Sequence, residues 1–154
     1  MRLVSWLRPT RARHRCRSKD HAYRFDYAFG PECASSELYE VGVRPVVRAV
    51  AQGFHGSCFA YGATGSGKTF TMTGSAEHPG VMPRAIEELF SRSAKEKDEL
   101  KWRFSLVYVE IYNERVKDLL NPMSGVDLDV REDARKGTHV AGAVEVAVLS
   151  LIHI

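Results

Sequence analysis

The sequence predicts an α/β fold of the P-loop NTPase type, with a largely parallel central sheet flanked by helices. Apolar segments of strand length alternate along the chain with segments of helical periodicity, an order typical of parallel strands joined by crossover helices. A glycine-rich stretch ending in lysine and threonine follows one predicted strand and precedes one predicted helix, the usual place of a phosphate-binding loop. The 154 residues, 44% hydrophobic and 27% charged, suit one soluble globular domain or most of one.

Two strands are predicted before the glycine-rich stretch. YRFDYAF, residues 23–29, alternates aromatic residues with polar or small ones, and Gly30 and Pro31 end it. SCFAY, residues 57–61, is a short apolar run. Such a run fits a central strand that is buried on both faces.

A helix is predicted between these strands, over residues 35–53. Ser35 or Ser36 can cap its start, and apolar residues recur near helical spacing within it. Pro45 lies inside the helix and should kink it, because proline removes a backbone donor and its ring clashes with the preceding turn. Gly53 should close the helix.

Helices and short strands are also predicted downstream of the glycine-rich stretch. One helix should run from near Gly67 through Met72, and a second over residues 81–95, with the loop 74–80 between them. Apolar alternation then predicts strands separated by turns. The predicted strands are 101–113, 126–130 and 138–148, and the predicted turns are 121–125 and Lys136–Gly137.

The glycine-rich stretch satisfies the phosphate-loop pattern G-x-x-x-x-G-K-[ST]. Glycines allow backbone angles that a Cβ would forbid, so that successive N–H groups turn toward one anion, and the following helix offers its positive end to the same anion. Lys68 would place a charge against the β- and γ-phosphates, and the Thr69 hydroxyl would ligate Mg²⁺. The predicted nucleotide-binding residues are Gly62, Ala63, Thr64, Gly65, Ser66, Gly67, Lys68 and Thr69. The structural alternative is a glycine-rich turn with an incidental lysine.

Basic residues concentrate at the start of the chain. Residues 1–19 hold seven Arg or Lys and no acid, whereas the rest of the chain holds 15 basic and 19 acidic residues. We expect residues 1–20 to form a disordered basic arm. Such an arm can contact nucleic acid, an acidic protein surface or a targeting receptor, and a solvated segment is the simpler interpretation.

Cysteine usage and hydropathy exclude several classes of protein. Cys16, Cys33 and Cys58 are widely spaced and match neither a metal-binding pattern nor an even disulfide framework, so we expect reduced thiols in a cytosolic protein. The sequence contains no run of 18 or more apolar residues, so no membrane span is predicted, and no secretory signal follows Met1.

The segments that flank the phosphate loop resemble the motor domain of kinesins. The resemblance covers about residues 21–148, and three segments carry most of it: FAYGATGSGKTFTMTG, PGVMPRAIEELF and VYVEIYNERVKDLL. YRFDYAFGPE is similar to the early F-x-F-D-x-x-F strand of the family. Within the family, YGATG, GVM and VDLDVREDARKGTHVAG are most similar to the kinesin-8 class, whose members walk toward microtubule plus ends.

This resemblance implies an ATP-dependent microtubule motor that uses ATP and Mg²⁺, binds tubulin and is located on the cytoplasmic cytoskeleton. Phe70 stands where the family often places a ring beside the adenine, and a ring there can stack on the base. Arg8 and Pro9 match the end of the R-x-R-P strand that lines the family's adenine pocket, although Trp6 stands where the first arginine is expected. In EIYNE, Tyr112 and Asn113 are expected to be structural rather than catalytic.

Two motifs with which kinesins respond to the γ-phosphate are missing from these 154 residues: switch I, N-x-x-S-S-R-S-H, and switch II, D-x-A-G-S-E. We therefore assign no catalytic residue. We expect the complete protein to be a microtubule-stimulated ATPase and these residues alone not to hydrolyse ATP. Residues 21–148 would be the N-terminal part of an incomplete kinesin motor domain, and LSLIHI, residues 149–154, would be an artefactual tail.

Three other functions stay open at this point. A nucleotide-binding pseudo-motor, or an inactive fragment, would bind without hydrolysis or stepping. A generic P-loop kinase or GTPase has less support, because no base-reading N-K-x-D motif is present. A nucleic-acid binder would depend on the basic arm alone, and we do not expect it. A stalk outside these residues would allow the motor to dimerise.

Overall fold

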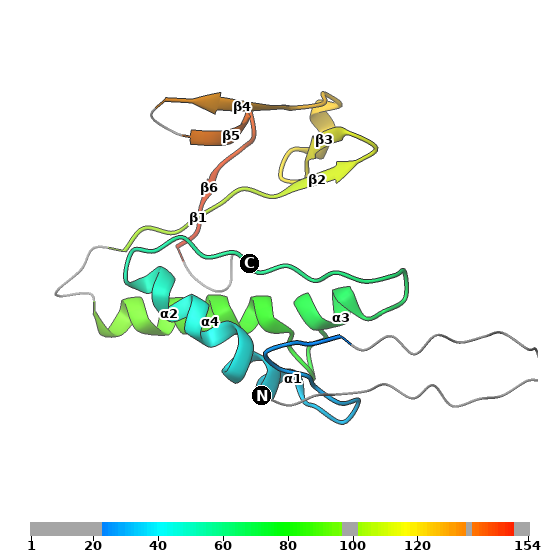
Figure 1. The fold of residues 1–154 in the computed structure, drawn as a ribbon. Helices are drawn as coiled ribbons and strands as arrows, with labels where there is room; N and C mark the ends of the chain where they lie inside the picture. Colours follow the sequence, from blue (N-terminus) through cyan, green and yellow to red (C-terminus); the bar gives the residue numbers. More distant parts are fainter. Residues whose placement is uncertain (1–22, 97–101, 135–136, 150–154) are drawn as a thin grey trace, which may run out of the picture. The chain divides into compact units, whose positions relative to one another are not determined.

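The computed structural model describes residues 23–96, 102–134 and 137–149. The chain divides into two units, Met1–Leu89 and Phe90–Ile154. Helices dominate the described part of the first unit, and short paired strands that of the second (Figure 1). The predicted basic arm, with Arg8 and Pro9, lies outside the described residues, as do residues 150–154 of the predicted tail. None of the helices that the structure describes is long and apolar enough to cross a membrane.

The predicted helix 35–53 forms as three consecutive segments: α1 (Ser35–Leu38), the π-helical η1 (Tyr39–Val43) and α2 (Arg44–Ala51). The Arg44 N–H donates to the Tyr39 carbonyl, which is five residues earlier rather than four. Pro45 follows directly, and its ring would clash with the carbonyl four residues before it in a regular α-helix. The widened turn relieves this clash, so the kink expected at Pro45 takes the form of a π turn.

The sequence predicted the C-terminal end of this helix correctly but not its N-terminal cap. The N-cap is Ala34 and no side chain caps the helix, so the prediction of a cap at Ser35 or Ser36 was wrong. The Ala34 carbonyl instead accepts from the amides of Glu37 and Leu38. The other end was predicted correctly, because Gly53 has a left-handed φ of 94° and its N–H donates to the Val50 carbonyl.

The predicted strands at residues 23–29 and 57–61 are not formed, and both predictions were wrong. Strands are stabilised by pairing with neighbours, and no described segment pairs with either of these two. Except for the partly buried Phe29, their aromatic side chains are exposed: 62% for Phe25, 85% for Phe59 and 97% for Tyr61. The expectation that residues 57–61 are buried on both faces is therefore also incorrect.

Two further helices follow in the places where they were predicted. α3 (Lys68–Met72) is short, and α4 (Val81–Lys95) continues from the first unit into the second. Between them, residues 74–80 form the predicted loop, in which Gly74 and Pro79 pair as an isolated antiparallel bridge. The core of the first unit consists of buried Tyr39, Val47 and Val81, packed against Leu38, Val43, Met72, Ala85 and Leu89.

The described part of the second unit contains six short strands and one 3-10 turn. They are β1 (Ser105–Leu106), β2 (Val109–Tyr112), β3 (Arg115–Asp118), η2 (Pro122–Ser124), β4 (Asp129–Asp133), β5 (Gly137–Ala141) and β6 (Val146–Ala147). The predicted strand 101–113 is thus divided between β1 and β2, and the predicted strand 138–148 between β5 and β6. The predicted strand 126–130 overlaps β4 only at Asp129 and Val130, and the predicted turn 121–125 contains η2. Of the turn predicted at Lys136–Gly137, Lys136 lies outside the described residues and Gly137 begins β5.

All strand pairs that the structure describes are antiparallel: β1 with β6, β2 with β3, and β4 with β5. The expected parallel sheet is therefore not formed among these residues. The β2–β3 pair shows the physical reason, because its two-residue turn has positive φ at Asn113 (49°) and Glu114 (61°). Such a turn matches the twist of a hairpin and brings consecutive strands together in opposite directions.

A buried carboxylate closes the end of the β2–β3 hairpin. Asp118 is 4% exposed. Its Oδ1 accepts from the amides of Leu120 (2.8 Å) and Asn121 (3.2 Å), and its Oδ2 accepts from the amide of Val144 (2.8 Å). The Val144 amide has the largest effect in lowering the pKa of Asp118 below its ordinary value of 3.8, against an opposing effect of desolvation.

Replacing this carboxylate, as in Asp118→Asn, should lower the unfolding temperature at neutral pH, because an amide NH₂ cannot accept from the Val144 N–H. Because the pKa of Asp118 is lower in the folded state, the ionised carboxylate stabilises the fold. This stabilisation is complete above the unfolded-state pKa of 3.8 and is lost as the pH falls through the folded-state pKa. The gap in stability between wild type and variant should therefore narrow in acid. Thermal melts from pH 7 to pH 2 would measure it. A gap that stays constant with pH would contradict this role.

Candidate phosphate-binding site

The loop before α3 adopts backbone angles that favour glycine. Gly65 has φ of 80° and Gly67 has φ of 88°, in the left-handed region where an L side chain costs about 1–2 kcal/mol. At Gly62 the reason is space rather than φ, because an added Cβ would overlap the Ser66 hydroxyl. Each of the three glycines in the motif therefore has a physical role in the folded loop.

Several polar groups of this loop have no partner of their own. The Ser66 N–H donates to the Ala63 carbonyl and closes the turn. The N–H groups of Gly65, Gly67, Lys68 and Thr69 find no acceptor among the residues that the structure describes. A group of free amides on a loop of this shape can bind an anion.

Lys68 lies over the start of the loop. Its Nζ donates to the carbonyl oxygens of Gly62 and Ala63, at 2.9 Å each. An ammonium group has three N–H donors, so one remains for a ligand. The Thr69 side chain is exposed, and its hydroxyl makes no hydrogen bond within the described part of the chain. The sequence-predicted residues 62–69 are therefore gathered in one place.

A cavity of about 400 Å³ adjoins this loop within the first unit. Ser66, Gly67 and Phe70 form one side of it, and Phe29 and Leu38 belong to the other lining residues. The Phe70 ring is 54% exposed, so a planar ligand can reach it. Phe70 and the phosphate loop are thus brought together, whereas Arg8 and Pro9, predicted for the same pocket, lie outside the described residues.

Sequence reasoning missed the far wall of this cavity. Phe29, Pro31 and Leu38 line it from a segment that precedes the loop in the sequence, Leu38 lying 24 residues before Gly62. No local pattern links the two segments, and only the resemblance of YRFDYAFGPE to the family's early strand pointed to this region. Cys33 also lines the cavity as a free thiol. Desolvation, followed by the Glu37 charge, raises the pKa of Cys33, which disfavours the reactive thiolate form.

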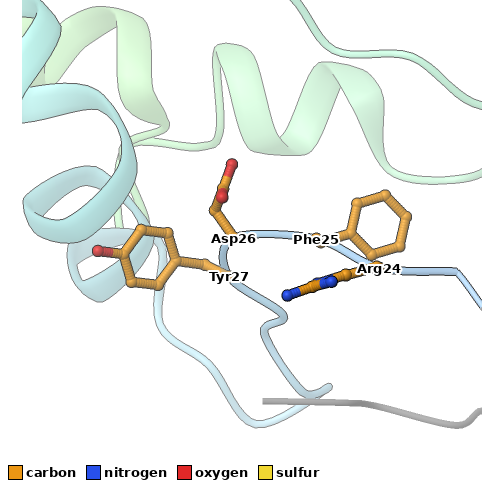
Figure 2. A pocket seen from close by; sticks show the side chains of 4 residues that line it. All are labelled: Arg24, Phe25, Asp26 and Tyr27. Atoms are coloured by element: carbon orange, nitrogen blue, oxygen red, sulfur yellow. The ribbon is translucent and has the colours of Figure 1, made fainter. Parts of the chain in front are cut away.

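A second cavity, of about 730 Å³, does not form a comparable site. It is lined by Arg24, Phe25, Asp26 and Tyr27, which are consecutive residues of one segment. Figure 2 shows these four side chains spread around the backbone rather than converging on one point. Binding sites combine enclosure with converging polar groups, so the phosphate loop is the better candidate.

Comparison with known proteins identifies the family. Residues 7–154 match the family model described as the kinesin motor domain. Kinesin-like protein KIN-7D, mitochondrial, from Arabidopsis thaliana is 46% identical over 132 residues, which are 86% of this chain and 12% of that protein. Kinesin-like protein KIF19 from Mus musculus is 37% identical over 134 residues, which are 87% of this chain and 13% of that protein. The chain thus spans a small part of the length of these relatives.

A solved structure agrees with the sequence relatives. It is described as the structure of a fast kinesin, with implications for the ATPase mechanism and for interactions with microtubules. It matches 87% of this chain and 39% of its own, with a TM-score of 0.82 and 33% identity. The predicted P-loop NTPase-type fold class is thereby confirmed, and the chain belongs to the kinesin motor domain family.

Proposed function

We propose that residues 21–148 are the ATP-binding, N-terminal part of the motor domain of an ATP-dependent microtubule motor. The observation that carries this proposal is the phosphate loop, with its unpaired amides and with Lys68 held across its first two carbonyls. A loop of this construction binds the phosphates of a nucleotide in many proteins. Because the chain belongs to the kinesin family, we propose that nucleotide binding serves a motor function.

Within this proposal, residues 62–69 bind the phosphates of ATP. The free amides and the third N–H of Lys68 bind the negative oxygens. The Thr69 hydroxyl is the proposed Mg²⁺ ligand. Mg²⁺ retains several waters and is bound by few protein groups together with phosphates, which agrees with the absence of any cluster of three or more His, Cys, Asp or Glu among the described residues. The metal ion would neutralise phosphate charge.

The adenine base is proposed to lie in the cavity beside the loop. The exposed Phe70 ring would stack on the base. Arg8 and Pro9 are proposed as further contacts of the base on the strength of the family's R-x-R-P strand.

Hydrolysis requires groups outside the residues assigned so far. The sequence of 154 residues contains neither switch motif, and the turnover of ATP needs a group that positions water and groups that respond to the γ-phosphate. We therefore assign these residues to binding and no residue to catalysis. The second candidate function is a nucleotide-binding pseudo-motor that binds without hydrolysis.

The finer assignments also remain proposals. Three segments, YGATG, GVM and residues 126–142, favour the kinesin-8 class, while the relatives carry names of the KIN-7, KIF19 and KIF22 types. Cytoplasmic microtubules are the proposed location, although one relative is named mitochondrial and two are named chloroplastic. We propose residues 149–154 as an artefactual tail, residues 1–20 as a basic arm, and dimerisation through a stalk outside this segment.

The test is a steady-state ATPase assay of the full-length gene product with and without microtubules. A motor should hydrolyse ATP slowly alone and many times faster with polymerised tubulin, and it should move microtubules over a coated surface. If the protein binds ATP and its turnover does not respond to microtubules, the pseudo-motor is correct. If it binds no nucleotide, both proposals are wrong.

A further inference from the structure

A polar cluster joins α4 to the π turn in the core of the first unit. The Tyr39 hydroxyl donates to Glu88 Oε2 at 2.8 Å, and the Arg44 Nε lies 3.0 Å from the same oxygen. Tyr39 is 4% exposed. Burial, followed by the hydrogen bond to Glu88, raises the pKa of Tyr39, so its hydroxyl remains a donor. One carboxylate on α4 therefore binds Tyr39 and Arg44 of the preceding helix, and its other oxygen lies 3.8 Å from the Nε of Arg48.

The π turn makes this arrangement possible. Tyr39 and Arg44 are five residues apart, and in a regular α-helix their side chains would point about 140° away from each other. The N–H of Arg44 donates to the carbonyl of Tyr39, so the widened turn returns the two residues to nearly the same face. Pro45 therefore has a consequence beyond the kink, because the turn that precedes it aligns two donors on Glu88.

The same cluster is connected to the phosphate loop through α3. Met72, the last residue of α3, packs against the core formed by Tyr39 and Val81. The Gly80 N–H donates to the Thr73 carbonyl, and a Cβ at Gly80 would lie 2.5 Å from the Met72 carbonyl oxygen. The start of α4 therefore lies directly on the end of α3, whose first residue is Lys68.

A second connection passes through the cavity. Leu38 immediately precedes Tyr39 and lines the cavity beside Gly67 and Phe70. The contact between Tyr39 and Glu88 therefore also holds one wall of the proposed base site. Both connections lie within the first unit.

We propose that Tyr39, Arg44 and Glu88 form a clamp that positions the phosphate loop, and that Glu88 is a positioning residue for the nucleotide. This inference rests on the proposed function of the loop. The clamp touches no ligand. It holds α4 against the π turn, and thereby fixes α3 and the cavity wall in the arrangement that binds Mg²⁺-nucleotide.

The experiment measures the affinity of the full-length gene product for Mg²⁺ and methylanthraniloyl-labelled ADP, at a temperature well below the unfolding temperature of every variant. Tyr39→Phe and Glu88→Gln should each weaken the affinity by about threefold to tenfold, as is typical of coupling through packed residues. Because both act on one contact, the double variant should be little weaker than the worse single variant. The matched control is Glu87→Gln on the same helix, since Glu87 is exposed and makes no ion pair with the described residues.

Three outcomes would overturn the inference. If Tyr39→Phe and Glu88→Gln lower the unfolding temperature but keep the wild-type affinity, the clamp stabilises the fold and does not position the loop. If Glu87→Gln weakens binding equally, the effect is one of net charge. If the wild-type protein binds no labelled ADP, the proposed function fails, and the clamp has no nucleotide site to position.

Discussion

Lys68→Ala should weaken the binding of Mg²⁺-ATP by about tenfold to 150-fold, the equivalent of losing one hydrogen bond to a charged group. The Lys68 Nζ uses two donors on the carbonyls of Gly62 and Ala63 and has a third for the phosphates. Alanine removes the charge and both contacts that hold it over the loop. Titration with labelled ATP would measure the affinity, and ATPase turnover at saturating microtubules should fall in parallel.

The fold should survive this change, because Lys68 is only partly buried and lies outside the core cluster. The unfolding temperature of Lys68→Ala should therefore stay close to that of wild type. Lys117→Ala is the matched control: it removes the same charge from an exposed position on β3, where Lys117 makes no ion pair with the described residues. If Lys68→Ala keeps full affinity, the phosphate-loop assignment is wrong. If Lys68→Ala and Lys117→Ala lose affinity equally, Lys68 contributes to ATP binding only through net charge and not through its place in the loop.

The features that the sequence could predict are those set by neighbouring residues. The angles of the phosphate loop follow from Gly65 and Gly67, both left-handed in the structure. The helix 81–95 follows from its apolar periodicity and forms with the predicted bounds. The β4–β5 hairpin likewise forms around Gly137, whose φ is 68°. In each case one short stretch contains the whole physical cause.

The features that the sequence could not predict depend on residues far apart in the chain. Residues 57–61 are apolar enough for a central strand, but a strand needs partners, and none of the described segments pairs with it. The sequence predicted only a kink at Pro45. It could not predict the π turn, because this turn aligns Tyr39 and Arg44 as donors to Glu88, which lies 43 residues after Pro45. The cavity wall at Leu38 likewise depends on distant residues, because Leu38 lines the cavity together with Gly67 and Phe70.

Gly74→Ala should destabilise the protein by about 2–5 kcal/mol, the sum of a left-handed backbone penalty and an overpacking penalty. Gly74 has φ of 72°, and an added Cβ would overlap three backbone atoms, of His78, Pro79 and Gly80. Backbone atoms of a closed loop cannot move aside as a flexible side chain can. The loop is closed by the hydrogen bond from the Ser75 N–H to the His78 carbonyl (3.0 Å). Denaturant unfolding followed by circular dichroism would measure the loss.

Gly125→Ala separates the two parts of this penalty. Gly125 has a similar φ of 61°, but nothing lies within 4 Å of an added Cβ, so this variant should lose only the backbone part, about 1–2 kcal/mol. Equal losses for the two variants would mean that the crowding at Gly74 is relieved by a small shift of the loop. A larger loss at Gly74 would mean that the loop is held rigidly. Since Gly80 lies against the backbone of Met72, Gly74→Ala should then also weaken nucleotide binding, and Gly125→Ala should not.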